Sequence, residues 1–422
     1  MNHKSILFDP IQILFGSNEN VKRDAVLISG QGELIAFGED ARKQGHSLGL
    51  NAILASEKLL APCLVDPHSV LSEPTNDKGE NLKSLRIALA RAGYGQVALL
   101  PRCSSSWRDR PERLEGFLNS TSDVLIHLWG SFSKEGKSIE LSPHASLLQH
   151  GAIGITEDDF YIPSSFLERG LLIGGMGSAP ILLAPRDPNI QGNGMVREGV
   201  EALRAGWAPD PVTSETLPLG SILQLQKHHP ERSIVIMNIG TADGVELIAN
   251  SKQSCPASVC WWHLVADSSL LNPEELGWKV NPSLGNPKDR EALIHGLKED
   301  TLTAISVHAI PLDEEDSQTP PNIQLPGIAG HQLVLPSLWN ELVVKSKWPI
   351  EKLWEKLSFG PSKMLQLPEE HLELGTKRWL LFDPDEYWVQ RRREIQNPNA
   401  ANQPWEGKTL KGKVIASGLK AY

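Results

Sequence analysis

Asp66 and His68 are the first residues of the chain whose types and spacing could carry out chemistry. They follow an apolar pair directly, in the order Leu-Val-Asp-Pro-His. This pattern is typical of a short buried strand that presents polar side chains at its carboxyl end. A carboxylate and an imidazole in such a place could bind a metal ion or move a proton. Further along the segment, Val70 has no donor atom and Ser72 offers only a hydroxyl.

Polar residues also follow later apolar segments. His263 and His308 end two of these segments, and we expect them to be hydrogen-bonded structural groups rather than metal ligands. The acidic run Glu157–Asp159 follows another segment and is predicted to be a solvated loop, with a carboxylate ligand as the alternative. For Asp66 and His68, a hydrogen-bonded polar plug is favoured over a surviving catalytic pair.

The elements that must position these residues alternate along the chain. Within residues 62–373, apolar segments rich in Val, Ile and Leu alternate with helical segments, one of which spans 81–92 and stops at Gly93. Apolar runs of this kind are typical of parallel strands covered by helices. The alternation favours a (β/α)8 TIM-type barrel over an open sheet. Residues 1–61 and 374–422 are instead rich in short strands and turns, so three segments are predicted.

Composition excludes several classes of function. The 422-residue chain has a formal net charge of −10, which argues against nucleic-acid binding, and its basic run Arg391–Arg393 is predicted to be a solvated face. No window approaches the roughly 20 apolar residues of a membrane-spanning helix, and no secretory signal is visible. The four cysteines are scattered and predicted to be buried thiols, so we expect a cytoplasmic protein.

Several segments together resemble one known family. The segment around Asp66 resembles the first barrel strand of the dihydroorotases, members of the amidohydrolase superfamily. Further similar segments lie along most of the chain, namely Ala92–Pro101, Gly151–Asp159, Thr241–Ile248, Lys279–Leu293, Gly327–Pro336 and Leu380–Glu386. The resemblance implies a barrel accompanied by a small β-sandwich built from both chain ends.

The resemblance also implies a zinc site, and that site looks degenerate in this sequence. His68 is retained, whereas the other main ligand positions and the position of the catalytic aspartate carry Val70, Ala184, Asn238 and Val307. None of these replacements is a good zinc ligand or a proton acceptor. The substrate-binding positions differ as well: Ser72 and Gly285 replace two arginines, and Arg102 stands where the family often has asparagine.

We therefore expect no catalytic residue and no bound metal, but a vestigial pocket made of Asp66, His68, Asn238, His263, Asn281 and His308. The resemblance implies a homologue from pyrimidine biosynthesis that is inactive and acts as a structural or regulatory partner, for example of aspartate transcarbamoylase or another enzyme of the pathway. A homo-oligomer is allowed. The alternative is an active cyclic amidohydrolase that binds zinc in an atypical site.

Overall fold

A computed structural model describes residues 4–75, 79–104, 107–114, 122–251, 255–270, 279–317, 319–320, 323–392 and 400–420. Six parallel strands form one curved sheet in the order β12-β9-β8-β7-β6-β5, and β13 and β14 form a parallel pair beside it. The bounds are β5 (Leu64–Ser69), β6 (Tyr94–Leu99), β7 (Leu125–Ser131), β8 (Ala152–Thr156), β9 (Pro180–Leu183), β12 (Ser233–Ile236), β13 (Ser258–Cys260) and β14 (Ala304–Ser306).

Backbone contacts close these strands into a ring. A parallel bridge between Ile236 and Ala257 joins β12 to the β13 side. On the other side, the Val70 amide donates to the Ala309 carbonyl at 2.7 Å, just beyond the ends of β5 and β14. The (β/α)8 class predicted from the sequence is thereby confirmed. Because the strands run in parallel, the residues after each strand meet at one mouth of the barrel.

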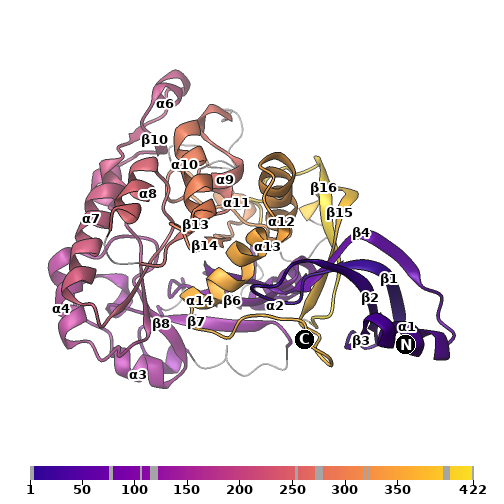
Figure 1. Cartoon of the computed structure of the whole chain (residues 1–422). Helices are drawn as coiled ribbons and strands as arrows, with labels where there is room; N and C mark the ends of the chain where they lie inside the picture. Colours follow the sequence, from indigo (N-terminus) through magenta and orange to yellow (C-terminus); the bar gives the residue numbers. More distant parts are fainter. Residues whose placement is uncertain are drawn as a thin grey trace.

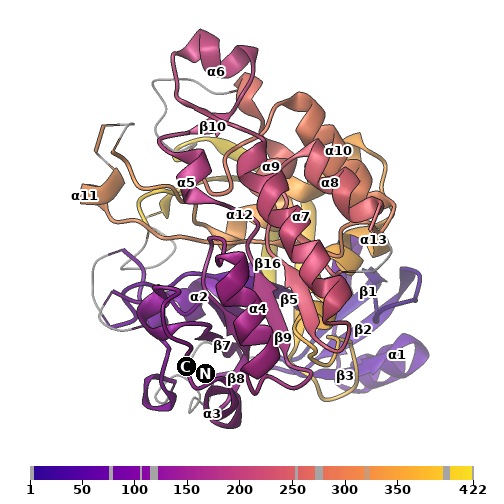
Figure 2. The ribbon, with the colours of Figure 1, turned by 90° about the vertical axis from the view of Figure 1, so that its left-hand side faces the viewer.

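Helices cover the outside of the ring (Figure 1), and Figure 2 shows α4 and α7 in front of the strands. Their bounds are α2 (Leu82–Ala92), α3 (His144–Gln149), α4 (Ser164–Ile173), α5 (Pro188–Gln191), α6 (Val200–Ala205), α7 (Thr213–His228), α8 (Ala242–Ala249), α9 (Trp262–Val265), α10 (Pro287–Lys298), α11 (Glu314–Ser317), α12 (His331–Leu338), α13 (Ile350–Trp354) and α14 (Gly360–Met364). Two π-helical segments, Trp339–Lys345 and Glu355–Phe359, continue α12 and α13. The short strands β10 (Val196–Arg197) and β11 (Pro209–Asp210) pair outside the ring.

Local sequence signals set the ends of the helix predicted at 81–92. Asn81 caps α2 by accepting from the Ser84 amide, while the Ser84 hydroxyl accepts from the Asn81 amide. At the other end Gly93 adopts φ 79°, the left-handed conformation that glycine takes without strain. Such capping removes unsatisfied amides and carbonyls, and it fixes where Tyr94 begins β6.

Strands from both chain ends form a second sheet, in the order β16-β15-β4-β1-β2-β3. The resemblance implied a small β-sandwich built from the two chain ends, and the structure shows their strands hydrogen-bonded in one six-stranded sheet apart from the barrel. Helix α1 (Gly38–Ser47) packs on it. The strands are β1 (Ile6–Ile13), β2 (Lys22–Ile28), β3 (Leu34–Phe37), β4 (Ile53–Pro62), β15 (Trp379–Val389) and β16 (Thr409–Ser417). Within the described part of the chain, no helix is both long and apolar enough to cross a bilayer.

Candidate functional site

Asp66 lies fully buried at the barrel mouth and joins three elements. Its Oδ1 accepts from the Val307 amide at 3.0 Å, and its Oδ2 accepts from the Ser69 hydroxyl at 2.5 Å and from His331 Nε2 at 3.2 Å. The Ser69 hydroxyl in turn accepts from the Ala309 amide at 2.8 Å. These bonds tie the end of β5 to the segment after β14 and to α12. Asp66 therefore closes the ring at the mouth.

His68 and His308 form a buried pair beside this junction. Their Nδ1 atoms lie 3.1 Å apart, and His68 Nε2 lies 2.9 Å from the Ser258 hydroxyl. The Ser258 hydroxyl accepts from the backbone N–H of Asn238 at 3.0 Å, and the Ser306 hydroxyl donates to the side-chain Oδ1 of Asn238 at 2.7 Å. These contacts thus join the residue after β12 (Asn238) to β13 (Ser258), then to β5 (His68), and then to the segment after β14 (His308).

The proton positions in this chain are coupled, because each hydroxyl and each neutral imidazole carries one proton. When Ser258 donates to His68 Nε2, His68 donates from Nδ1 to His308, whose own proton then sits on Nε2. When His68 donates to Ser258 instead, His308 donates from Nδ1 and its Nε2 carries a lone pair. In both arrangements each ring nitrogen of His68 is engaged in a hydrogen bond.

The acidic run after β8 corrects the prediction of a solvated loop. Glu157, Asp158 and Asp159 are buried, with exposures of 1%, 1% and 4%. Glu157 accepts from the Ser133 amide at 2.8 Å and from the Ser138 hydroxyl at 2.7 Å. Charge and hydrogen-bond partners from other parts of the chain permit this burial, and such partners cannot be read from an acidic run alone.

Two arginines hold the paired aspartates. Arg102 Nε lies 3.0 Å from Asp158 Oδ2, and its Nη1 lies 3.9 Å from Asp159 Oδ1. Arg186 Nη2 lies 3.3 Å from Asp159 Oδ1, while its Nε donates to the Asp159 carbonyl at 2.7 Å and its Nη1 to Gln191 Oε1 at 2.7 Å. The two guanidinium groups thus balance the charge of the two carboxylates.

These surroundings separate the protonation behaviour of the two carboxyl groups. Burial raises the pKa of Asp158 to about 7, although Arg102 opposes the rise. Burial also acts to raise the pKa of Asp159, but Arg186 and Arg102 outweigh it and lower that pKa. Burial lowers the pKa of His68 to about 3 and that of His308 to about 4, so both imidazoles are neutral near pH 7.

Among the atoms at the mouth that lack a hydrogen-bond partner within the described residues, three lie side by side in sequence-distant segments: Asp159 Oδ2, Asn238 Nδ2 and His308 Nε2. Their residues line a small cavity of about 10 Å³ beside Arg186. That volume is close to the space of one water molecule, and a water there would meet three polar partners. The backbone is strained at this place, with φ 106° at Asp158, 47° at Asn238 and 48° at His308.

A wider cavity of about 330 Å³ opens outward from this point and shares Asp159 and Asn281 with the small one. Ser72 and Arg102 also line it. Asn281 lies beside Asp159 and contributes to the lowered pKa of that carboxyl. His263 is turned to another partner, since its Nε2 donates to the Pro282 carbonyl at 3.0 Å, and burial lowers its pKa to about 4.

The structure therefore brings Asp66, His68, Asn238, Asn281 and His308 of the predicted pocket to one mouth. Sequence reasoning missed other members that hold them in place, namely Ser69, Arg186, Ser258, Ser306 and His331. Arg186 directly follows the Ala-Pro pair after β9. A charged residue just after a buried strand could have been predicted to reach the mouth, whereas nothing in the sequence around the serines predicts their place there.

The donor atoms do not fit the zinc ion that the family resemblance implies. Both nitrogens of His68 are taken, and Val70, Ala184 and Val307 contribute no donor atom. No cluster of three or more His, Cys, Asp or Glu side chains in the described ranges is arranged to hold a metal ion. A closed or catalytic zinc site needs at least three protein ligands.

Comparisons with known proteins identify the family of the chain. A "Probable dihydroorotase-like protein" of Synechocystis sp. is 35% identical over 402 residues, covering 86% of this chain and 89% of the relative. The chain belongs to the dihydroorotase-like proteins of the amidohydrolase superfamily. A dihydroorotase of Thermus aquaticus is 26% identical over 422 residues, covering 96% of each chain. No family model matches the chain.

Solved structures show the same architecture. The L-hydantoinase (dihydropyrimidinase) from Arthrobacter aurescens superposes with a TM-score of 0.75 at 17% identity, covering 97% of this chain and 93% of its own. A dihydropyrimidinase from Brevibacillus agri gives 0.74 at 16% identity, with the same coverage. These likenesses show the fold of this dihydroorotase-like chain.

Proposed function

We propose that this dihydroorotase-like protein does not catalyse the metal-dependent reaction and serves pyrimidine biosynthesis as a structural or regulatory partner. The observation that carries the proposal is the state of His68. This residue stands at a ligand position of the family, yet both of its nitrogens are bound to Ser258 and His308. A neutral imidazole held at both ends has no lone pair left for a metal.

The eighth strand supports the same conclusion. Val307 stands where the family has the aspartate that shuttles the proton, and it is 2% exposed, so its side chain fills space in the core. The Val307 amide is bound to Asp66. A valine at this place accepts no proton, and hydrolysis of a cyclic amide needs a group that does.

Aspartate transcarbamoylase, or another enzyme of the pathway, is the partner we propose, and the location we propose is the cytoplasm. The four cysteines are free and buried, which is usual in a reducing compartment. The partner proposal is tested by gel filtration of the protein with aspartate transcarbamoylase from the same organism. Co-elution in a defined ratio supports it, and separate elution at micromolar concentrations contradicts it.

The loss of catalysis is tested by the metal content of protein purified without chelator or histidine tag, together with dihydroorotate turnover. We expect less than about a tenth of an equivalent of zinc, since a closed site normally retains its metal. About one equivalent of zinc, or turnover near that of an active dihydroorotase assayed in parallel, would contradict the proposal.

A second candidate is hydrolysis of a cyclic amide in an atypical site. The observation that favours it is the strained backbone at Asp158, Asn238 and His308, beside buried polar atoms that have no hydrogen-bond partner in the described part of the chain. Strain of this kind concentrates at functional sites. This candidate predicts turnover that collapses in His308→Gln, whereas the partner role predicts that His308→Gln still co-elutes with the partner.

A further inference from the structure

The wider cavity at the barrel mouth, of about 330 Å³, has a buried acceptor atom in its wall that the described fold leaves unused. Asp159 lines this cavity and is 4% exposed, and its Oδ2 has no hydrogen-bond partner among the described residues. The ion pairs of Arg186 and Arg102 with Asp159 run to the other oxygen, Oδ1, at 3.3 Å and 3.9 Å. A buried polar atom without a partner is costly, so a ligand that donates to Oδ2 is favoured. We call this space the outer mouth cavity.

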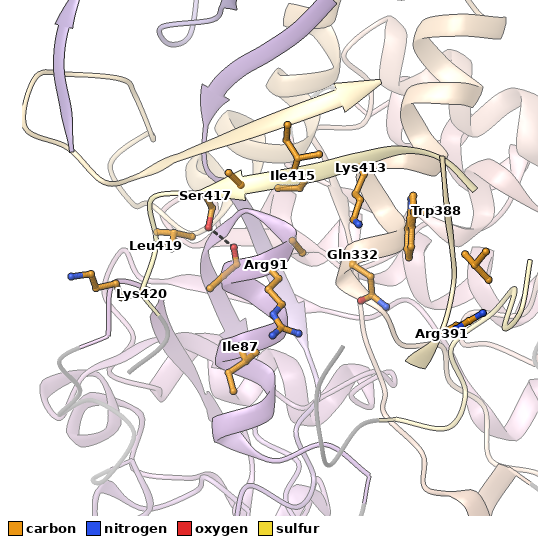
Figure 3. Close-up of a pocket in the computed structure, with 15 residues that line it drawn as sticks. Ile87, Arg91, Gln332, Trp388, Arg391, Lys413, Ile415, Ser417, Leu419 and Lys420 are labelled. Carbon is orange, nitrogen blue, oxygen red and sulfur yellow. Dashed lines mark hydrogen bonds between the residues drawn. The ribbon is translucent and has the colours of Figure 1, made fainter. Parts of the chain in front are cut away.

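A larger cavity, of about 910 Å³, lies between α2 and β16 and lacks this feature. The Ser417 hydroxyl donates to the Ala90 carbonyl at 2.6 Å between two of its walls, as Figure 3 shows. Among the side chains that the structure describes along these walls, none has a buried polar atom without a hydrogen-bond partner. The unused acceptor therefore favours the mouth, and not this larger space, as the place that holds a small ligand.

The charge of the outer mouth cavity is negative. Glu73 and Asp313 line it together with Asp159, and no described cation forms an ion pair with Glu73 or Asp313. Arg102 is the one cation among the lining residues that the structure describes, and its guanidinium already lies 3.0 Å from Asp158 Oδ2 and 3.9 Å from Asp159 Oδ1. The charge of Arg102 is thus balanced within the protein. The remaining carboxylates attract a cation.

Apolar side chains form another part of the cavity wall. Ile310 and Leu312 are buried, whereas Leu325, which lines the cavity with Pro311 and Pro326, is 52% exposed. A half-exposed leucine at the edge of a cavity is stabilised when methylene groups of a ligand cover it. The wall therefore suits a ligand with an aliphatic part. The volume of about 330 Å³ lies at the lower end of the range of small-molecule sites.

We propose that the outer mouth cavity binds a small aliphatic diamine, a linear molecule with an ammonium group at each end. One ammonium group would donate to Asp159 Oδ2 at the buried end, and the other would meet Glu73 and Asp313, which are half-buried. The methylene groups would lie against Leu325. A carboxylate oxygen accepts more than one hydrogen bond, so a water in the small cavity leaves Oδ2 able to accept from the ammonium group. The site goes beyond the proposed function, since it needs neither zinc nor catalysis.

Isothermal titration calorimetry of the full chain with linear diamines of three to six carbons tests the ligand class. We expect one saturable site per chain for at least one of them. The whole chain has a net charge of −10, so unspecific attraction must be distinguished from binding in the cavity. The form of the best diamine that carries a trimethylammonium group at each end has the same charge but no N–H donor, and it should bind at least tenfold more weakly. Equal binding of the two, or no saturable binding of any diamine at millimolar concentrations, would overturn the proposal.

Two further ligands of the same chain length test the two-ended placement and the charge. The monoamine should bind at least tenfold more weakly than the diamine, because it leaves one end of the cavity without a cation. The diol has hydroxyl donors but no charge, and it should also lose at least tenfold. A monoamine that binds as tightly as the diamine would overturn the two-ended placement, and a diol that does so would overturn the charge assignment.

Matched variants locate the site. Glu73→Gln combined with Asp313→Asn removes two charges from the cavity wall and should weaken binding of the diamine at least tenfold. Asparagine at 313 keeps an oxygen that can accept from the Asp316 amide, which lies at 2.8 Å in the wild type. Glu168→Gln combined with Glu246→Gln removes two charges at exposed positions of α4 and α8 and should alter binding less than twofold. Unchanged melting temperatures would show that both double variants fold, and equal weakening by the two would overturn the proposal.

The proposed function is tested with no amine present, through zinc content, turnover and co-elution, so the two proposals can fail separately. A chain that binds the diamine as expected but contains zinc would support the cavity assignment and contradict the loss of catalysis. A chain that is free of zinc and binds no diamine would leave the proposed function intact and overturn the cavity assignment.

Discussion

Replacement of Arg186 by methionine tests whether protein cations hold the buried carboxylates of the mouth. Arg186 is 13% exposed and Asp159 is 4% exposed, with 3.3 Å between Nη2 and Oδ1. Loss of one partner of a buried ion pair typically costs about 3–5 kcal/mol, because the other charge stays buried without compensation. Arg102 Nη1 remains 3.9 Å from the same oxygen and compensates in part. We therefore expect Arg186→Met to lower the free energy of unfolding by about 3 kcal/mol.

Urea unfolding at pH 7.5 and pH 5.5 measures this loss. Arg186 lowers the pKa of Asp159 in the wild type, so in Arg186→Met burial should dominate and raise that pKa. The destabilisation should then shrink at pH 5.5, where the carboxyl group binds a proton. Adding Asp159→Asn to Arg186→Met should recover most of the loss at pH 7.5. Arg169→Met, at an exposed position of α4, is the control and should change stability by less than about 0.5 kcal/mol.

A loss below about 1 kcal/mol in Arg186→Met would refute the reasoning, since the carboxylate would then not depend on this cation. So would a loss that is equal at both pH values and unchanged by Asp159→Asn. That result would place the effect in the hydrogen bond from Arg186 to Gln191 instead.

Two further predictions concern the same mouth. Val307→Asp should destabilise the protein by about 2–4 kcal/mol without a gain of bound zinc, because the substitution buries a carboxyl group. Thermal unfolding and metal analysis check this prediction, and Val344→Asp, at a more exposed position, is the control. Between pH 7 and pH 5 the free energy of unfolding should fall, because the folded chain keeps His68 and His308 neutral while the unfolded chain protonates both near pH 6.5. Each histidine contributes up to about 1.4 kcal/mol of this loss per pH unit. Asp158, with its pKa of about 7, offsets part of the loss because it binds a proton in this range only when the chain is folded. Urea titrations of wild type and His308→Gln check the second, and equal slopes for the two would contradict it.

The fold was largely predictable because its signals are local. Asn81 and Gly93 mark the ends of α2 through capping and a left-handed turn, both of which depend on residue type within a few positions. Runs of Val, Ile and Leu mark the buried strands in the same local way. That β15 pairs with β4 is a contact between residues about 320 apart in the chain, such as Trp379 with Pro62, and no local pattern contains it. The family resemblance supplied it.

The mouth was predictable only in part, because its interactions join distant segments. The run Glu157–Asp159 looked like a solvated loop, since three acids in a row normally remain in water. The burial of Asp158 and Asp159 depends on Arg102 and Arg186, which follow other strands, and Glu157 is held by Ser133 and Ser138. The state of His68 likewise depends on Ser258, 190 positions away. Sequence alone identifies some of the residues that reach the mouth, but not the serines that join them or which residues bind one another.

The ring closure explains how this chain holds a buried aspartate at the first strand with hydrogen bonds from its own residues. Asp66 takes two hydrogen bonds from Val307 and Ser69, and a third from His331. Backbone and hydroxyl donors of this kind stabilise a carboxylate as charge-assisted hydrogen bonds. The Val307 amide donates whatever side chain the residue carries. Under the proposed loss of catalysis, valine in place of an aspartate would remove a proton acceptor and leave the closure intact. The closure at this strand thus depends on a backbone atom of residue 307, whereas the proposed loss of catalysis depends on its side chain.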